Sequence, residues 1–317
     1  MTAVPLLRVE SPGLLTTVQD EGRWGHQRDG MVVAGAMDPF AAAVANLLVG
    51  NPRGAAVIEI TLLGPALRAL TDVCLALCGG DLSPQIDGLP APSWKTFTLR
   101  GGQSLTFGRR RSGARAYLAV AGGFQVPAVL GSRATFLRAR LGGFEGRPLK
   151  AGDVLEGIRQ TPPSAERGLR PADIPAYTQP AVLRVLPGPH LSAFTGESLD
   201  TFFSSTYTVS PQSDRQGYRL SGPAVARTDA TDLLSEAMPW GGAQVPPDGA
   251  PILLMADRQT TGGYPLVAVV VSADLYRAGQ LALGDAVQFQ VVTLAEAHEL
   301  AARQERSLRV VAGACLS

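Results

Sequence analysis

The hydrophobic positions of the chain fall into short runs separated by glycine, proline, aspartate or serine. Runs of this kind, rich in β-branched residues or alternating with polar ones, are typical of β-strands. The clearest of them predict strands over Val73–Leu77, Ser104–Phe107, Ala116–Val120, Val182–Leu186, Ile252–Met255, Leu266–Val271 and Val287–Val292. The pattern therefore indicates a chain built mainly from short strands.

Only three segments predict helices. Asp38 can cap a helix that has Pro39 at its first position and runs to Val49, because a side-chain oxygen there accepts an otherwise unpaired backbone N–H. A second segment covers about Ser198–Ser205. A third starts at Thr293, three residues before Glu296, which is the spacing of a capping box. Helices this few do not alternate with the strands as a doubly wound fold requires, so we expect a mainly β fold with a few short helices.

Composition supports this fold class and excludes several partners. The 36 glycines and 24 prolines make up about 19% of the 317 residues, against a usual share near 12%, which indicates many tight turns. The formal net charge of +1 gives no field that would attract nucleic acid or an anionic membrane surface. Three cysteines, no long apolar run and no signal-peptide pattern at the start lead us to expect a cytoplasmic protein without a disulfide framework.

A proline-rich segment divides the chain into two parts of similar length. Residues 160–180 contain five prolines and little periodic hydrophobicity, which is typical of a linker. We therefore expect an N-terminal domain over residues 1–165, a linker over 166–180 and a C-terminal domain over 181–317. Similar segments, LLRVESPG against VLRVLPG and LKAGDVL against LALGDAV, favour a duplicated β-barrel. The alternative is that the same strand-turn chemistry occurs independently in both halves.

The common signatures of metal and nucleotide sites are missing from the sequence. The three histidines are far apart, without the spacing of zinc ligands, so we expect no metal. There is also no phosphate-binding G-x-x-x-x-G-K-[ST] motif, and no G-x-S-x-G nucleophile turn. Candidate chemistry lies instead in three polar, glycine-rich clusters: TTVQDEGR from Thr16, SPQSDRQGYR from Ser210 and ADRQTTGGYP from Ala256.

Of the three clusters, the third has the pattern most typical of a binding site. It lies between two strongly apolar strands, and Gly262 and Gly263 allow a close approach of the backbone. Arginine and glutamine side chains such as Arg258 and Gln259 can grip a carboxylate, amide or ureido group. The alternative is a structural loop in which an aspartate–arginine pair and the threonines satisfy their own backbone.

These clusters also carry a family resemblance. The segments TTVQDEGRWG, GAMDPFAAAVANLLVGN, IEITLLGP, SPQSDRQGYRLSGP and DRQTTGGYP occur together and in this order. Over residues 5–292 the sequence resembles the biotin-dependent carboxyltransferase-like family. That family includes the C component of 5-oxoprolinase, the antagonist of the sporulation-kinase inhibitor, the second component of allophanate hydrolase and the carboxyltransferase part of urea amidolyase.

The resemblance implies a fold of two cyclophilin-like β-barrel domains and work within a complex. The implied partners are a homologue of the B component of 5-oxoprolinase, in a tight complex, and a homologue of its A component. The implied activity is that of an ATP-hydrolysing 5-oxoprolinase, an amidohydrolase that opens the cyclic amide 5-oxoproline to L-glutamate. ATP would then be used by the complex, and we expect no cofactor on this chain itself.

The site residues follow from the matching motifs. As catalytic residues the resemblance implies Arg215, Asp257, Arg258 and Tyr264. As substrate-binding residues it implies Asp214, Gln216, Tyr218, Glu236, Gln244, Gln259, Thr260, Gly262 and Gly263. The chain departs from the family pattern at Ala237, where a glycine is usual, and at Gln216, where methionine is common, which puts the pocket wall there in doubt.

The residue types suggest roles for these groups. Opening an amide or ureido group requires stabilisation of a carbonyl oxygen as it becomes negative, and arginine suits that work. We expect Arg215 and Arg258 to bind this charge or a substrate carboxylate, and Asp257 or Tyr264 to take part in proton transfer. Gln259 and Thr260 would orient the amide.

Two alternative functions remain open at this point. The first is a carboxyltransferase component that moves a carboxyl group from carboxybiotin to urea or a similar amide. It needs biotin on another chain, because the sequence has no A-M-K-M attachment motif. The second is a regulatory protein that binds and antagonises a kinase-inhibitor homologue, which predicts binding without turnover.

Overall fold

The computed structural model describes residues 2–160, 166–228 and 233–316, and the chain divides into two compact units. The first unit takes residues 1–23, 34–177 and 306–317, and the second takes 24–33 and 178–305. The two units exchange segments: residues 24–33 group with the second unit, although the chain around them belongs to the first.

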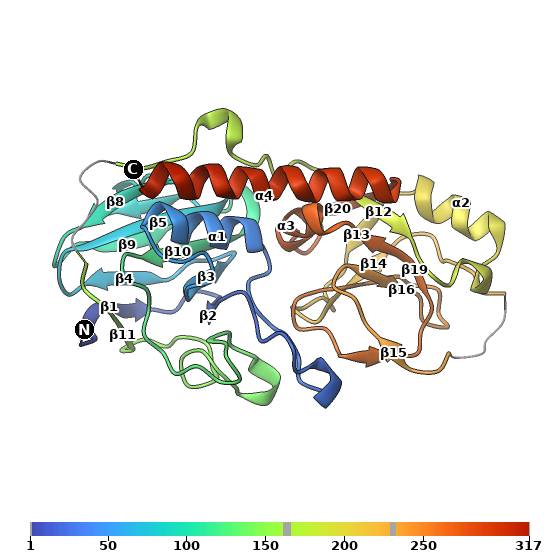
Figure 1. The fold of residues 1–317 in the computed structure, drawn as a ribbon, viewed down its shortest axis with the longest axis horizontal. Helices are drawn as coiled ribbons and strands as arrows, with labels where there is room; N and C mark the ends of the chain where they lie inside the picture. Colours follow the sequence, from blue (N-terminus) through green and yellow to red (C-terminus); the bar gives the residue numbers. More distant parts are fainter. Residues whose placement is uncertain (1, 161–165, 229–232, 317) are drawn as a thin grey trace. The chain divides into compact units, whose positions relative to one another are not determined.

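Strands dominate both units (Figure 1). In the first unit they are β1 (Val4–Ser11), β2 (Leu15–Gln19), β3 (Val57–Thr61), β4 (Ala66–Ala69), β5 (Val73–Asp81), β6 (Pro84–Ile86), β7 (Leu89–Pro90), β8 (Lys95–Leu99), β9 (Ser104–Phe107), β10 (Ser112–Val120) and β11 (Val154–Gly157). In the second they are β12 (Ala181–Pro187), β13 (Tyr207–Val209), β14 (Gly217–Ser221), β15 (Glu236–Ala237), β16 (Gly242–Gln244), β17 (Ile252–Leu254), β18 (Thr261–Gly262), β19 (Leu266–Val270) and β20 (Ala286–Val291).

The described residues form four α-helices: α1 (Pro39–Leu48), α2 (Gly196–Ser204), α3 (Leu275–Gly279) and α4 (Leu294–Leu316). The predicted caps are confirmed, since the carboxylate of Asp38 accepts the backbone N–H of Ala41. Thr293 and Glu296 form the capping box in both directions. Helix α4 is longer than the short helix expected, and its residues from Arg306 onward group with the first unit.

The first unit consists of two sheets around one core. Their strand orders are β11-β1-β4-β9-β6-β7 and β2-β3-β10-β5-β8, and buried side chains of both sheets, such as Leu7, Ile58 and Leu118, belong to one apolar cluster. Strand β5 is buried along almost its whole length because α1 covers β5 and β10 on their other side (Figure 1).

The second unit holds a closed barrel of seven strands in the order β12-β19-β16-β17-β14-β13-β20. Helix α2 covers part of it, and the ring of Phe202 stacks on Phe289 of β20 with centroids 4.7 Å apart. All seven predicted strands exist, and the mainly β fold with a barrel is confirmed.

In the first unit, loops bond to the edge strands of the two sheets. The N–H of Thr96 in β8 donates to the carbonyl of Arg167, and that of Leu149 donates to Thr16 in β2. Pro90, in the edge strand β7, has no N–H to donate. These edges are therefore occupied or blocked rather than joined to one another.

The described part of the proline-rich segment is bonded to the first unit. Besides Arg167, the N–H of Leu169 donates to the carbonyl of Trp94, and Leu169 is 7% exposed. The phenol of Tyr177 donates to a carboxylate oxygen of Asp38 at 3.0 Å. Residues 161–165, which were also placed in this segment, lie outside the described residues.

Candidate functional site

Two neighbouring barrel strands bring the SPQSDRQGYR and ADRQTTGGYP segments together. Strands β14 and β17 are antiparallel, and their pairing continues beyond the strand ends: the N–H of Met255 donates to Gln216, and that of Asp257 donates to Arg215, both at 2.9 Å. The residues just before β14 and just after β17 therefore lie side by side. This register is the reason that two motifs far apart in sequence form one cluster.

Arg215 and Asp257 form a buried ion pair in this cluster. Nε and Nη2 of Arg215 donate to the two carboxylate oxygens of Asp257 at 3.1 and 3.0 Å. The two residues are only 5% and 7% exposed. A bidentate pair of this kind is strong when both charges are out of water, and it fixes the turn after β17 against the turn before β14.

Arg258, the next residue, is buried without a carboxylate partner among the described residues. Its Nε donates to the carbonyl of Met238 at 3.0 Å, whereas Nη1, which is also buried, has no hydrogen-bond partner in the described structure. Burial lowers the pKa of Arg258 to about 10, because a buried cation loses its hydration. The guanidinium therefore has a donor that no described residue accepts.

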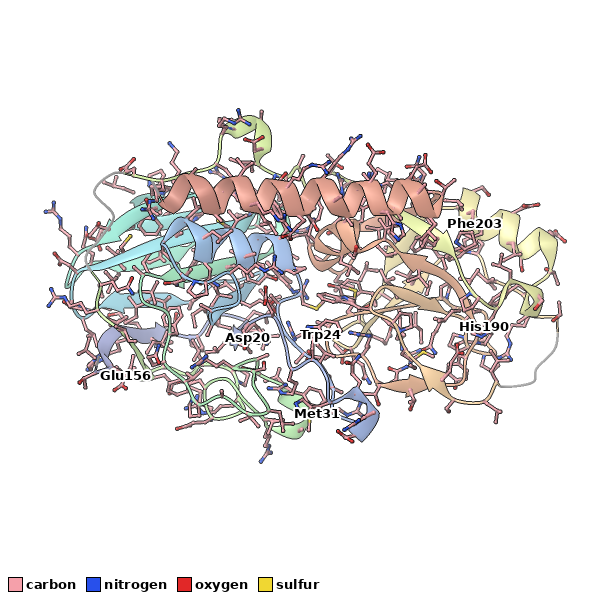
Figure 2. The ribbon with its side chains drawn as sticks, in the orientation of Figure 1. Asp20, Trp24, Met31, Glu156, His190 and Phe203 are labelled. Carbon is pink, nitrogen blue, oxygen red and sulfur yellow. The ribbon has the colours of Figure 1, made fainter. Side chains whose placement is uncertain are left out.

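Trp24 lies over this arginine. Trp24 is labelled in Figure 2. The guanidinium carbon of Arg258 is 6.0 Å from the centre of its ring, and Trp24 is 52% exposed. At that distance the ring face attracts the cation. Trp24 belongs to the segment 24–33 that joins the second unit, so an N-terminal residue completes this site.

Two facing carboxamides lie beside the arginine. Nε2 of Gln259 donates to Oε1 of Gln244 at 3.0 Å, and Nε2 of Gln244 donates to the carbonyl of Tyr264 at 3.3 Å. Gln244 is 2% exposed. Oε1 of Gln259 accepts no hydrogen bond from the described residues. Gln259 therefore offers an acceptor next to the donor of Arg258 in the chain.

A two-stranded ribbon, β15 with β18, packs on this cluster. Glu236 pairs with Gly262, and the N–H of Met238 donates to the carbonyl of Thr260 at 3.0 Å. A Cβ added at Gly262 would lie 2.8 Å from Nε2 of Gln244. The expected close approach of the backbone is thus an approach to the protein's own side chains.

The remaining predicted site residues among the described residues make no hydrogen bond to the side chain of Arg258. Asp214 is exposed, and its carboxylate accepts the N–H groups of Gln216 and Gly217, so it shapes a turn. Tyr218 is 3% exposed, in β14. Gly263 accepts the N–H of Leu233. Tyr264 is 38% exposed, and its hydroxyl has no hydrogen bond to the described residues.

Glu236 bonds to a residue that the sequence motifs did not include. Nε2 of His190 (Figure 2) lies 3.2 Å from Oε1 of Glu236, and its Nδ1 accepts the N–H of Leu266 at 3.1 Å. His190 thus connects β15 with β19. The sequence analysis considered His190 only as one of three histidines that could bind a metal. Trp24 and Met238 were not predicted as site residues, because neither side chain carries an obvious catalytic group.

Two structural features are absent from the described residues. These residues contain no group of three or more His, Cys, Asp or Glu side chains that could hold a metal ion. None of the helices among them combines the length and apolar composition needed to cross a membrane. The arrangement around Arg258 offers hydrogen bonds and charge, which are the groups that polarise a carbonyl or hold a carboxyl group.

These features describe a β-barrel protein with a buried cationic site suited to an amide or a carboxyl group. Residues 29–291 match the family described as carboxyltransferase domain, subdomain A and B. The chain belongs to this family, as the sequence motifs predicted.

Similar proteins carry two kinds of name. The chain is 40% identical over 301 residues to the C component of 5-oxoprolinase from Escherichia coli, covering 95% of each chain. It is 35% identical to urea amidolyase of Lachancea kluyveri, covering 96% of this chain and 18% of that one. The solved structure of urea amidolyase from K. lactis superposes with a TM-score of 0.87 at 31% identity, covering 98% of this chain and 20% of that one.

Proposed function

We propose that this chain is the C component of a 5-oxoprolinase complex, which opens 5-oxoproline to L-glutamate with hydrolysis of ATP. The observation that carries the proposal is the end-to-end match with the C component of the Escherichia coli enzyme, 95% of both chains at 40% identity. In the proposed complex, homologues of the A and B components are the partners. Because the sequence has no G-x-x-x-x-G-K-[ST] motif, ATP is assigned to the partners.

Arg258 and Gln259 are proposed to bind the amide of the substrate. The ring of 5-oxoproline presents a carbonyl oxygen and an N–H group. The buried Nη1 of Arg258, without a partner among the described residues, suits the carbonyl oxygen as it becomes negative, and Oε1 of Gln259 suits the ring N–H. Water then adds across the C–N bond, which breaks to release the amine and the new carboxyl group of glutamate.

The other predicted catalytic residues receive different roles in this proposal. Arg215 and Asp257 hold each other in a buried bidentate pair, so they are assigned to positioning the turn that carries Arg258. Tyr264, which is partly exposed, is the proposed proton-transfer group. Its phenol is in contact with solvent, where a proton can be exchanged.

The test is reconstitution of the complex with each component left out in turn. The chain is mixed with its A and B component homologues, 5-oxoproline and ATP, and glutamate release is measured. Activity that disappears without this chain supports the proposal. A stable three-component complex without glutamate release, with all components folded, contradicts it. Arg111→Gln, at an arginine whose side chain is 74% exposed, serves as the control variant for the site variants.

Carboxyl transfer is the second candidate function. It is favoured by the family description and by the superposition on urea amidolyase. The same site would then hold the carboxyl group as it passes from carboxybiotin, supplied by another chain, to urea. Consumption of carboxybiotin that depends on both urea and this chain would favour this candidate over the first.

A further inference from the structure

A cavity of about 150 Å³ lies in the first unit, and none of the predicted site residues lines it. It sits where the chain leaves α1, at Gly50 to Pro52, and where it leaves β10, at Gly122 to Gln125. Its volume equals the liquid volume of about five water molecules. The cavity therefore has room for one small molecule, not for a nucleotide or a peptide.

One arginine of the cavity wall is held in place with its end unpaired. The backbone N–H of Arg133 donates to the carboxylate of Asp20, and its Nε donates to the carbonyl of Val126 at 3.0 Å. Nη1 and Nη2 have no bond to any of the described residues. A half-buried guanidinium fixed in this way loses little conformational freedom when it binds a ligand.

The cavity wall itself contains one positively charged side chain, that of Arg133, and no acidic one. The nearby carboxylate of Asp20 accepts the Ser132 hydroxyl and the N–H groups of Gly22 and Arg133. It makes no hydrogen bond to the guanidinium of Arg133, so Nη1 and Nη2 of that arginine keep their donors for an anion.

The rest of the wall selects among anions. Pro52 and Ala55 give it an apolar side, in front of the buried Phe124. Gln125 and Gln160 contribute carboxamides that make no hydrogen bond to the described residues. A guanidinium binds the two oxygens of a carboxylate with two parallel hydrogen bonds. An organic acid can use both the guanidinium and the apolar side, but an inorganic anion can use only the first.

We propose that this cavity binds a small organic carboxylate of about five to eight non-hydrogen atoms, with its carboxyl group on Arg133 and its hydrocarbon part on Pro52 and Ala55. The site belongs to the first unit, whereas Arg258 belongs to the second. It does not depend on the function proposed for the Arg258 cluster. It would allow an acid to bind to this protein without occupying that cluster.

The test uses isothermal titration of the full chain with butyrate and with butyramide, which has the same shape but no charge. We expect butyrate to bind in the millimolar range and butyramide at least tenfold more weakly. Arg133→Gln should weaken butyrate binding tenfold or more, because hydrogen bonds to a charged group are lost. Ala55→Met, which fills the apolar side and leaves Arg133 intact, should also weaken it, and Arg111→Gln should not.

Three results would overturn the proposal. The first is equal binding of butyrate and butyramide, or no binding of either. The second is inorganic phosphate binding as tightly as butyrate, because that would make the apolar wall irrelevant. The third is butyrate binding that is lost in Arg258→Gln but kept in Arg133→Gln, which would place the acid in the other unit. Thermal unfolding of each variant checks that the first unit is intact.

Discussion

Replacing Asp257 with alanine would leave the guanidinium of Arg215 buried without the carboxylate that accepts two of its hydrogen bonds. The two residues are 5% and 7% exposed, so little water can replace the lost partner. Breaking a buried pair from one side typically costs about 3–5 kcal/mol. At about 3 °C per kcal/mol for a unit of this size, the unfolding transition of the second unit should fall by roughly 10 °C.

The assay is calorimetry and urea unfolding of the full chain, with a double-mutant cycle. Arg215→Met should cost a similar amount. The double variant Arg215→Met/Asp257→Ala should cost much less than the two single costs added together, because no buried charge is left alone. Asp214→Ala is the matched control in the same turn. It removes an exposed carboxylate that accepts two backbone N–H groups, so we expect a loss of about 1 kcal/mol.

A stable but inactive Asp257→Ala chain would refute the positioning role of Asp257. If that variant unfolded within about 1 kcal/mol of the parent and glutamate release still vanished, Asp257 would be acting on the substrate rather than on Arg215. The catalytic role that the motifs suggested would then replace the positioning role.

Three further predictions concern Arg258, Gly262 and Cys78. Arg258→Ala should lower turnover of the reconstituted complex by about 10²-fold or more, and normal turnover of this variant would show that Arg258 does not bind the developing negative charge. Turnover of the parent should decline as the pH rises through about 10, where Arg258 loses its charge. Gly262→Ala puts a Cβ 2.8 Å from Nε2 of Gln244 and 3.2 Å from the sulfur of Met238. Urea unfolding should therefore show that the free energy of unfolding falls by about 1–3 kcal/mol. Gly196→Ala is the control, because its Cβ would meet nothing within 4 Å, and it should show no loss. Burial raises the pKa of the Cys78 thiol well above its usual value, so iodoacetamide at pH 8.5 should label Cys78 only after the chain is unfolded. Peptide mass spectrometry measures this labelling, and labelling of Cys78 in the folded chain would contradict the prediction.

The secondary structure was largely accessible from the sequence, because each element is encoded by neighbouring residues. The apolar run at Leu266–Val271 predicts β19, and the Thr293–Glu296 spacing predicts the start of α4. The five-residue helix α3 (Leu275–Gly279) was missed, since a helix of little more than one turn has no apolar period to detect.

The candidate site was accessible only in part. The motifs identified Arg215, Asp257 and Arg258. They did not show that Arg215 and Asp257 form an ion pair, or that Arg258 has no acidic partner among the described residues. That difference arises from the register of β14 against β17, which depends on the whole barrel. The position of Trp24 over Arg258 was equally out of reach, because nothing in residues 24–33 indicates which unit they join.

The exchange of residues 24–33 has a consequence for how this protein can be divided. A gene cut within the proline-rich segment would yield a C-terminal fragment that lacks Trp24, the residue over Arg258, and an N-terminal fragment that lacks residues 306–317. Neither fragment would contain all of its own unit. The two halves are therefore not interchangeable cassettes, and duplication or shuffling of one half alone would leave Arg258 without its aromatic neighbour.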